Sequence, residues 1–226
     1  MSHTQNIARI KAVYNALGDL KDKVVFVGGA TVSLYADREA PQIRPTDDVD
    51  IVVEISSRSA YAVLEQQLRN MGFRNDVTAN FLGRYLLPGV IVDVMPTDET
   101  ILGFSNRWYA EGFKTALFYK IDKQHQVKIF TPPVFIASKL EAFKNRGGND
   151  GRTSSDFEDI VFVLENRTVI WQEVAAAPKP LIFYLRKEFG ELLKNPYCQE
   201  WLSAHSNVYP PSSYYIMKDM KAFVEL

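Results

Sequence analysis

Two aspartates stand one residue apart at the start of an apolar run, in Thr46-Asp47-Asp48-Val49-Asp50-Ile51-Val52-Val53. Because side chains two positions apart on a strand lie on one face, we expect Asp48 and Asp50 to point the same way. Two carboxylates on one face repel each other unless a divalent cation or water separates them. Magnesium prefers oxygen ligands and often links one or two carboxylates to substrate phosphates. The pair therefore predicts either a metal site or an acidic, solvated strand end.

A third acid, Asp93, lies within Gly89-Val90-Ile91-Val92-Asp93-Val94-Met95. This stretch is apolar at both alternating sets of positions, which predicts a buried central strand. An isolated ionised carboxylate in such a strand is costly unless it is paired or bound to a metal. Two explanations compete, a salt bridge with an arginine such as Arg84 and a metal ligand beside Asp48 and Asp50. We favour the metal ligand because the sequence already offers Asp48 and Asp50 as a pair of candidate ligands.

Two glycines follow a short apolar strand, in Val24-Val25-Phe26-Val27-Gly28-Gly29, and residues 30–36 then predict a helix. A strand that runs through glycines into a helix leaves backbone N–H groups at a helix N-terminus, where a triphosphate can bind. The alternative is a tight turn that needs glycine for its backbone angles. Thr46, just before the acids, carries a hydroxyl that either lies near the phosphates or serves as a turn residue.

The elements that must position these residues follow from the spacing of apolar side chains. Up to residue 131, we expect helices over 7–17 and 59–71 and strands over 24–27, 49–55, 81–87, 90–95, 116–121 and 127–130. After Pro132-Pro133 the pattern is helical, over 134–144, 155–165, 181–193, 196–204 and 214–224. We therefore predict an α/β (α+β) fold, with a mixed sheet flanked by helices in residues 1–131 and a helical C-terminal part in residues 132–226.

The composition is that of an ordinary soluble globular protein. There are 26 Lys+Arg against 27 Asp+Glu, so net charge gives no argument for RNA, although a local basic patch would suffice to bind it. Cys198 is the only cysteine, which excludes a disulfide framework and a cysteine-based zinc site. Apolar runs fall short of the roughly 20 residues that a membrane-spanning helix needs. The N-terminus does not read as a secretory signal, so the expected compartment is a cytoplasm, with no membrane partner.

The helical part holds two further candidates. Lys139 lies on an expected helix with an apolar face, where it is either a solvated base or a point charge for a triphosphate. Ser155 with Glu158 forms a capping-box pattern, so Asp156 either favours the helix N-terminus or belongs to a site. Aromatic residues of this part are expected first as core, and otherwise as stacking surfaces for bases or sugars. These are Trp171, Tyr184, Tyr197, Trp201, Tyr209, Tyr214 and Tyr215.

Together these residues resemble the nucleotidyltransferase superfamily, the fold typified by DNA polymerase β. The family pattern is a Gly-Gly or Gly-Ser turn, then Asp-x-Asp on the next strand, then a third Asp on a later strand. Gly28-Gly29, Asp48 with Asp50, and Asp93 match it in that order. The resemblance spans roughly residues 24–164.

The sequence of residues 26–30 and 44–50 most resembles that of the AbiEii-type branch, which contains abortive-infection and toxin–antitoxin proteins. That branch also carries a Lys-rich helix and an Asp-rich helix, to which residues 139–146 and 155–160 are similar. Two features depart from the branch. Residues 40–45 look like an insertion before the acids, and Ser154-Ser155 replaces the usual Lys or Arg before the Asp-rich helix.

The resemblance implies transfer of a nucleoside monophosphate from a nucleoside triphosphate to an acceptor hydroxyl, on an RNA 3′ end or a protein. It implies two Mg²⁺ ions, for which Mn²⁺ can substitute, and in a toxin pair an antitoxin partner. The alternatives are a small-molecule nucleotidyltransferase of the antibiotic-modifying type and a nucleotide-binding module without turnover. The implied roles are metal binding by Asp48, Asp50 and Asp93, nucleotide binding by Gly28, Gly29, Thr46 and Lys139, and a catalytic part for these acids, Lys139 and Asp156.

Overall fold

The computed structural model describes residues 2–37, 43–146, 150–206 and 212–226. The chain divides into two compact units, the first made of Met1–Thr31 and Ile43–Thr131, the second of Val32–Gln42 and Pro132–Leu226. The short segment after the two glycines thus belongs with the helical part. Its apolar side chains explain why, since the ring of Tyr35 packs on Phe135 with centroids 4.4 Å apart, and Arg167 donates to the Tyr35 carbonyl. Residues 40–42 of the expected insertion lie outside the described residues.

The first unit contains a seven-stranded sheet in the order β3-β4-β5-β2-β1-β7-β6. It is mixed, because β2 runs parallel to β5 but antiparallel to β1, while β1 runs parallel to β7. The predicted α/β class, with a mixed sheet flanked by helices, is confirmed. The strands are β1 (Val24–Val27), β2 (Asp48–Val53), β3 (Arg74–Asn75), β4 (Arg84–Leu87), β5 (Val90–Pro96), β6 (Leu117–Lys120) and β7 (Gln126–Ile129).

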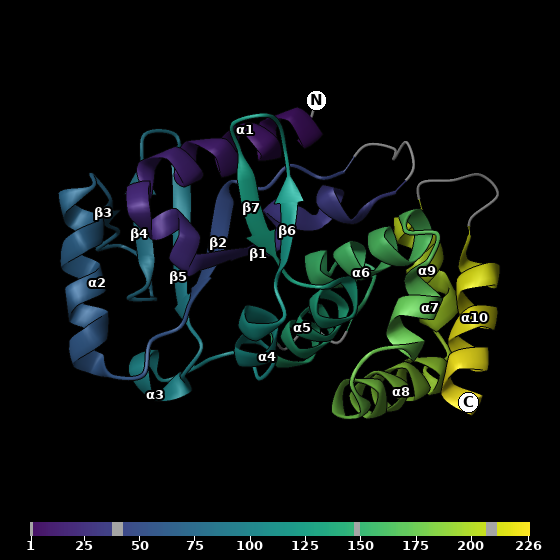
Figure 1. Cartoon of the computed structure of the whole chain (residues 1–226). Helices are drawn as coiled ribbons and strands as arrows, with labels where there is room; N and C mark the ends of the chain where they lie inside the picture. Colours follow the sequence, from purple (N-terminus) through teal and green to yellow (C-terminus); the bar gives the residue numbers. More distant parts are fainter. Residues whose placement is uncertain (1, 38–42, 147–149, 207–211) are drawn as a thin grey trace. The chain divides into compact units, whose positions relative to one another are not determined.

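Helix α1 (Ser2–Ala16) lies across the sheet near β2 and β5 (Figure 1). Ile10, Val13 and Leu17 recur at helical spacing and are fully buried, which gives this segment the apolar stripe that holds it on the sheet. Helix α2 (Arg58–Asn70) begins at Ser57, whose side chain accepts from the backbone N–H of Ala60, and lies beside the edge strand β3. The remaining helical elements are η1 (Gly18–Lys23), η2 (Gly29–Tyr35), α3 (Glu99–Leu102) and α4 (Tyr109–Lys114).

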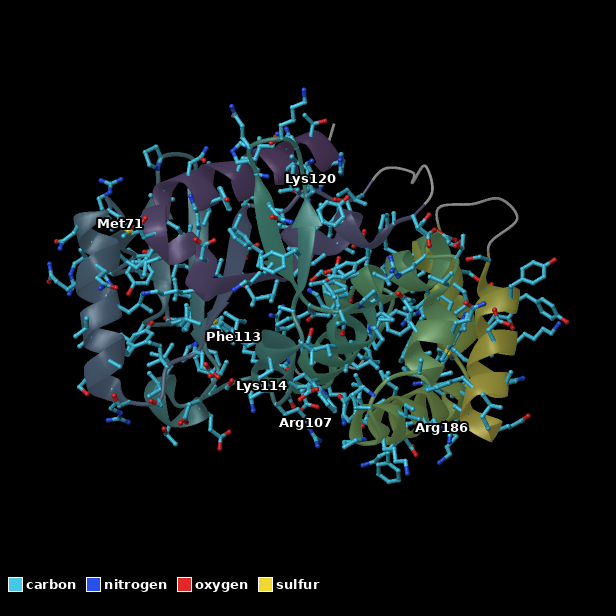
Figure 2. The ribbon with its side chains drawn as sticks, in the orientation of Figure 1. Met71, Arg107, Phe113, Lys114, Lys120 and Arg186 are labelled. Atoms are coloured by element: carbon cyan, nitrogen blue, oxygen red, sulfur yellow. The ribbon has the colours of Figure 1, made fainter. Side chains whose placement is uncertain are left out.

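Three differences from the expected elements have local causes. The helix expected over residues 30–36 is a 3₁₀ segment of seven residues, η2. The strand expected from Phe81 begins at Arg84, because the Phe81 ring turns to pack on Phe104 with centroids 5.1 Å apart. The elements β3, α3, α4, η1 and α7 (Ile170–Ala175) were not expected, being too short for apolar periodicity to mark. Figure 2 labels Met71 at the end of α2 and Lys120 at the end of β6, both close to the expected boundaries.

The described C-terminal part of the second unit is helical. Two aromatic clusters fill its core. Ring centroids lie 5.4 to 6.2 Å apart in the cluster of Phe143, Phe157 and Trp201, and 5.8 to 6.2 Å apart in that of Trp171, Phe189 and Phe223. The helices are α5 (Pro132–Asn145), α6 (Ser155–Asn166), α7 (Ile170–Ala175), α8 (Lys179–Lys194), α9 (Cys198–His205) and α10 (Ser213–Glu225).

The aromatic residues considered as stacking surfaces divide between core and surface. Trp201 and Tyr184 are buried, and Trp171 belongs to the second cluster. Tyr197, Tyr214 and Tyr215 are exposed, while Tyr209 lies outside the described residues. Among the residues that the structure describes, no helix has the length and apolar character needed to cross a membrane.

Cys198 lies in the core of the second unit, with 1% of its surface exposed. Burial raises the pKa of this thiol to about 11, because the thiolate is poorly solvated there. We expect iodoacetamide at pH 8 to modify Cys198 slowly in the native protein and rapidly in concentrated urea, as followed by mass spectrometry. Equal rates in the two conditions would contradict the packing of α9.

Candidate active site

The structure brings Asp48, Asp50 and Asp93 to one face of the sheet. Asp48 and Asp50 are half-buried and alternate along β2 with the buried Val49 and Ile51. Strand β5 runs parallel to β2 in a register that sets Asp93 directly opposite Asp50. Neighbouring strands lie about 4.8 Å apart, and residues directly opposite each other share a face. The carboxylates of Asp50 and Asp93 therefore start from adjacent backbone positions, with Asp48 two residues earlier on β2.

Gly28 gives the carboxylate of Asp50 its space. Val27 is the cross-strand partner of Asp50, and the chain turns at Gly28 with φ +72°. A Cβ on Gly28 would lie 1.8 Å from Oδ2 of Asp50, so the carboxylate would have to move away. Glycine at this position permits the left-handed backbone and leaves room for the carboxylate where it now lies.

The structure supports phosphate binding beside Gly29 less strongly than the sequence pattern did. Gly29 begins the 3₁₀ segment η2, and the Thr31 backbone N–H and hydroxyl both turn back to the carbonyl of Gly28. A 3₁₀ segment of seven residues has a smaller dipole than a long α-helix. A helix N-terminus therefore gives no support to phosphate binding here. Phosphate binding by Gly28 and Gly29 stays a prediction that rests on the turn's backbone N–H groups alone.

Replacing Gly28 by alanine tests the close approach. Gly89 supplies a matched control, because its φ is +74° and a Cβ there would meet nothing within 4 Å. We expect Gly89→Ala to lower the free energy of unfolding by about 1–2 kcal/mol, the cost of a left-handed backbone. Gly28→Ala is expected to lower it by roughly 1–3 kcal/mol more, since Asp50 must move. Urea titration measures both, and equal losses would show that the contact with Asp50 is unimportant.

Thr46 holds the irregular segment that leads into β2. Its hydroxyl donates to Oδ1 of Asp48, and its backbone N–H donates to the side chain of Asn6 on α1. Arg9, also on α1, donates to the Thr46 carbonyl and pairs with Asp47 at 2.9 Å. These contacts fix the start of β2 against α1. Thr46 itself lies in irregular chain just before a bend at Asp47, so the structure does not show it as a turn residue, and a role near phosphates stays a prediction.

Asp93 makes the salt bridge that competed with metal binding. Nε of Arg84 donates to Oδ1 of Asp93 at 2.8 Å, and Nη2 donates to Oδ2 at 2.7 Å. Arg84 is the cross-strand partner of Asp93 on β4, so the register itself places the two together. Hydrogen bonds to Asp93 raise the pKa of Arg84 most; burial opposes this, and the charges of Asp48 and Asp50 add to it. Arg84 is therefore in electrostatic contact with all three acids.

The donor set fits a magnesium ion in part. Asp48 and Asp50 offer hard oxygen ligands on one face, which is the chemistry that magnesium selects. Both oxygens of Asp93, however, are engaged by Arg84. Consistent with this, no group of three or more His, Cys, Asp or Glu is arranged to hold a metal within residues 2–37, 43–146, 150–206 and 212–226. A third carboxylate ligand requires Asp93 to leave Arg84.

In the second unit, Lys139 and Asp156 meet in a buried ionic network. Nζ of Lys139 lies 3.0 Å from Asp156 and 2.7 Å from Asp159, and Arg146 lies 3.2 Å from the other oxygen of Asp156. Burial lowers the pKa of Lys139, but the two carboxylates outweigh it and hold the pKa above its ordinary value. Lys139 is thus a permanent cation whose charge is already balanced. These contacts favour a structural role for it, joining α5 to α6.

The start of α6 differs from the expected capping box. The capping residue is Ser154, whose hydroxyl accepts from the backbone N–H of Phe157 at 3.2 Å. The pattern built on Ser155 and Glu158 was therefore wrong by one residue, because either of two adjacent serines can cap. Asp156 lies in the first turn of α6, as expected, where its charge favours the helix N-terminus in addition to pairing with Lys139.

Two residues of these clusters were not among the predicted site residues. Asp159 lies three positions after Asp156, so both face the same side of α6, and this spacing could have identified it. Arg84 was considered only as a competitor for Asp93. Its electrostatic interaction with Asp48 and Asp50 depends on the strand order β4-β5-β2, which no local pattern contains.

A comparison of the chain with protein-family models gave no match. A comparison with curated proteins also gave no significant match. The geometry of these side chains is accordingly the basis for the function proposed below.

Proposed function

We propose that this protein is a magnesium-dependent nucleotidyltransferase, which moves a nucleoside monophosphate from a nucleoside triphosphate to an acceptor hydroxyl. The observation that carries the proposal is the register of β2 and β5, which sets Asp93 beside Asp50 and on the same face as Asp48. The turn at Gly28, shaped around Asp50, supports it. A solvated strand end would not need a left-handed glycine packed against its carboxylate.

Each residue has a stated task in this reaction. When bound, magnesium supplies positive charge that stabilises the attacking and leaving oxygens of an in-line displacement. Asp48 and Asp50 would hold it, and Thr46 orients Asp48 through its hydroxyl. Asp93, once free of Arg84, would complete the ligand set near the acceptor hydroxyl. The N–H groups of Gly28 and Gly29 would hold phosphate oxygens. Binding of the triphosphate by Lys139 and a catalytic part for Asp156 belong to this proposal, although the contacts of Lys139 favour a structural role.

The acceptor is proposed from the family resemblance, which favours an RNA 3′ end or a protein side chain in the cytoplasm and, for a toxin, an antitoxin partner. One surface feature suits RNA. Tyr214 and Tyr215 at the start of α10 are each 66% exposed and meet edge to face, with centroids 5.5 Å apart. Exposed rings of this kind stack on unpaired bases. A small-molecule acceptor has no such supporting observation.

A second candidate function has one observation in its favour. Arg84 donates to both oxygens of Asp93 and so balances the charge of this acid without a metal ion. This arrangement suits a nucleotide-binding module without turnover. The two candidates differ in product. A catalyst consumes the triphosphate and releases pyrophosphate, whereas a binding module leaves it intact.

The test is incubation of purified protein with Mg²⁺, each of the four labelled nucleoside triphosphates, and total RNA or protein extract. We expect one triphosphate to label one class of acceptor and to release pyrophosphate. Calorimetry with the same triphosphates runs in parallel. Binding of a triphosphate without pyrophosphate release would favour the second candidate, and absence of both would reject the two together.

A further inference from the structure

Arg84, Asp93 and Asp50 form one row across three adjacent strands. Arg84 on β4 stands opposite Asp93 on β5, which in turn stands opposite Asp50 on β2. Residues that are direct partners share a face, so the row carries a positive charge next to two negative ones, with Asp48 two residues along β2. Three carboxylates gathered this closely need positive charge nearby. One guanidinium offsets one of their three negative charges.

The pairing of Arg84 with Asp93 is well built. It uses two parallel N–H donors at 2.8 and 2.7 Å, the bidentate geometry in which guanidinium binds carboxylate most strongly. The side chain of Asp93 is only 10% exposed, so the pair is partly shielded from water and weakly screened by salt. Asp48 differs from Asp93 in this respect, since the hydroxyl of Thr46 donates to only one of its oxygens. The three acids are therefore not equivalent toward a cation.

We propose that Arg84 acts as an internal counter-ion that competes with a divalent cation for Asp93. The resting site then takes one cation at Asp48 and Asp50, and a second only when Arg84 releases Asp93. This inference rests on the proposed function, because it concerns the same acids. It assigns Arg84 a positioning role, in which the residue sets how many cations bind and need not touch the substrate.

Titration of the protein with Mn²⁺ alone, followed by electron paramagnetic resonance of the free ion, tests the proposal without any measurement of activity. We expect the wild type to bind one Mn²⁺ and to bind a second at least about tenfold more weakly. In Arg84→Gln the second ion should bind about tenfold more tightly than in the wild type. The control is Arg69→Gln, which removes an exposed guanidinium from α2 that contacts Gln66 and Asn75, and which should match the wild type.

Thermal unfolding gives a second readout. Without metal, Arg84→Gln should be less stable than the wild type because its acids lose their counter-ion. Added Mg²⁺ should raise its midpoint temperature by more than that of the wild type. If Arg84→Gln does not fold, Arg84→Lys replaces it, since lysine keeps the charge but lacks the bidentate fork. That variant should bind the second Mn²⁺ with an affinity between those expected for the wild type and Arg84→Gln.

The outcomes separate the inference from the function. If the wild type and the Arg84 variant bind the same number of Mn²⁺ ions equally tightly, the inference is wrong and the proposed function stands. Weaker binding by the variant also overturns it, because Arg84 would then support the cation site. If neither protein binds Mn²⁺ up to millimolar concentration, the inference and the proposed function fail together.

Discussion

Asp50→Asn is expected to reduce nucleotidyl transfer by roughly 10²–10³-fold or more, the cost of losing one preorganised charge contact at a transition state. The amide has the shape of the carboxylate and so keeps the packing against Gly28. It cannot provide the negative charge that holds a divalent cation. The same result is expected for Asp48→Asn. Initial rates of label transfer at saturating triphosphate measure both.

Stability separates this effect from misfolding. Because Asp48, Asp50 and Asp93 repel one another in the absence of metal, Asp50→Asn should not lower the free energy of unfolding. The matched control is Asp47→Asn, at an acid whose side chain is 86% exposed, pairs with Arg9 and lies outside β2. Its transfer rate should stay within about twofold of wild type. An equal loss in Asp47→Asn would mean that the strand's local charge, and not its inward-facing acids, supports the reaction.

Lys139→Met is expected to lower the free energy of unfolding of the second unit by about 3–5 kcal/mol, because it leaves two buried carboxylates without their shared cation. The control is Lys194→Met, at an exposed pair with Glu191 on α8, where the loss should be at most about 0.5 kcal/mol. Urea titration measures both. Combining Lys139→Met with Asp156→Asn and Asp159→Asn should recover much of the loss, since no unpaired buried charge remains.

The pH dependence of the same network has a defined sign. Folding holds the pKa of Lys139 above its ordinary value, since Asp159 and Asp156 outweigh the effect of burial. A group whose pKa is raised by folding contributes stability fully below its unfolded pKa, about 10.4 for lysine, and loses it as pH rises through the higher folded pKa. The wild type should therefore not lose this contribution between pH 6 and pH 9. A fall over that range caused by Lys139 would mean that its amine is not held by the two acids.

The spacing of residues predicted the acids better than it predicted their partners. Period-two alternation was sufficient to place Asp48 and Asp50 on one face, because strand geometry fixes side-chain direction locally. The position of Asp93 opposite Asp50 depends on which strands are neighbours and in what register, which apolar patterning does not encode. For the same reason the sequence allowed a salt bridge between Arg84 and Asp93 but did not indicate that it forms.

The wrong predictions for residues 30–36 and for the first residue of α6 share a cause, because in both places the local sequence fits two structures equally well. Residues 30–36 are short and apolar, and such a run does not distinguish an α-helix from the 3₁₀ segment η2. At α6, two adjacent serines satisfy the same capping preference, so the pattern could not choose Ser154 over Ser155. Longer segments such as α5 and α8 carry several turns of apolar side chains, and their existence was predicted with ends displaced by only one or two residues.

The most direct test of the metal assignment is a crystal structure of the protein soaked with Mn²⁺ and a non-hydrolysable nucleoside triphosphate, with anomalous scattering to locate the ion. We expect an anomalous peak within coordination distance of carboxylate oxygens of Asp48 and Asp50, with the triphosphate beside Gly28. A bound triphosphate with no Mn²⁺ on either aspartate at saturating metal would contradict it.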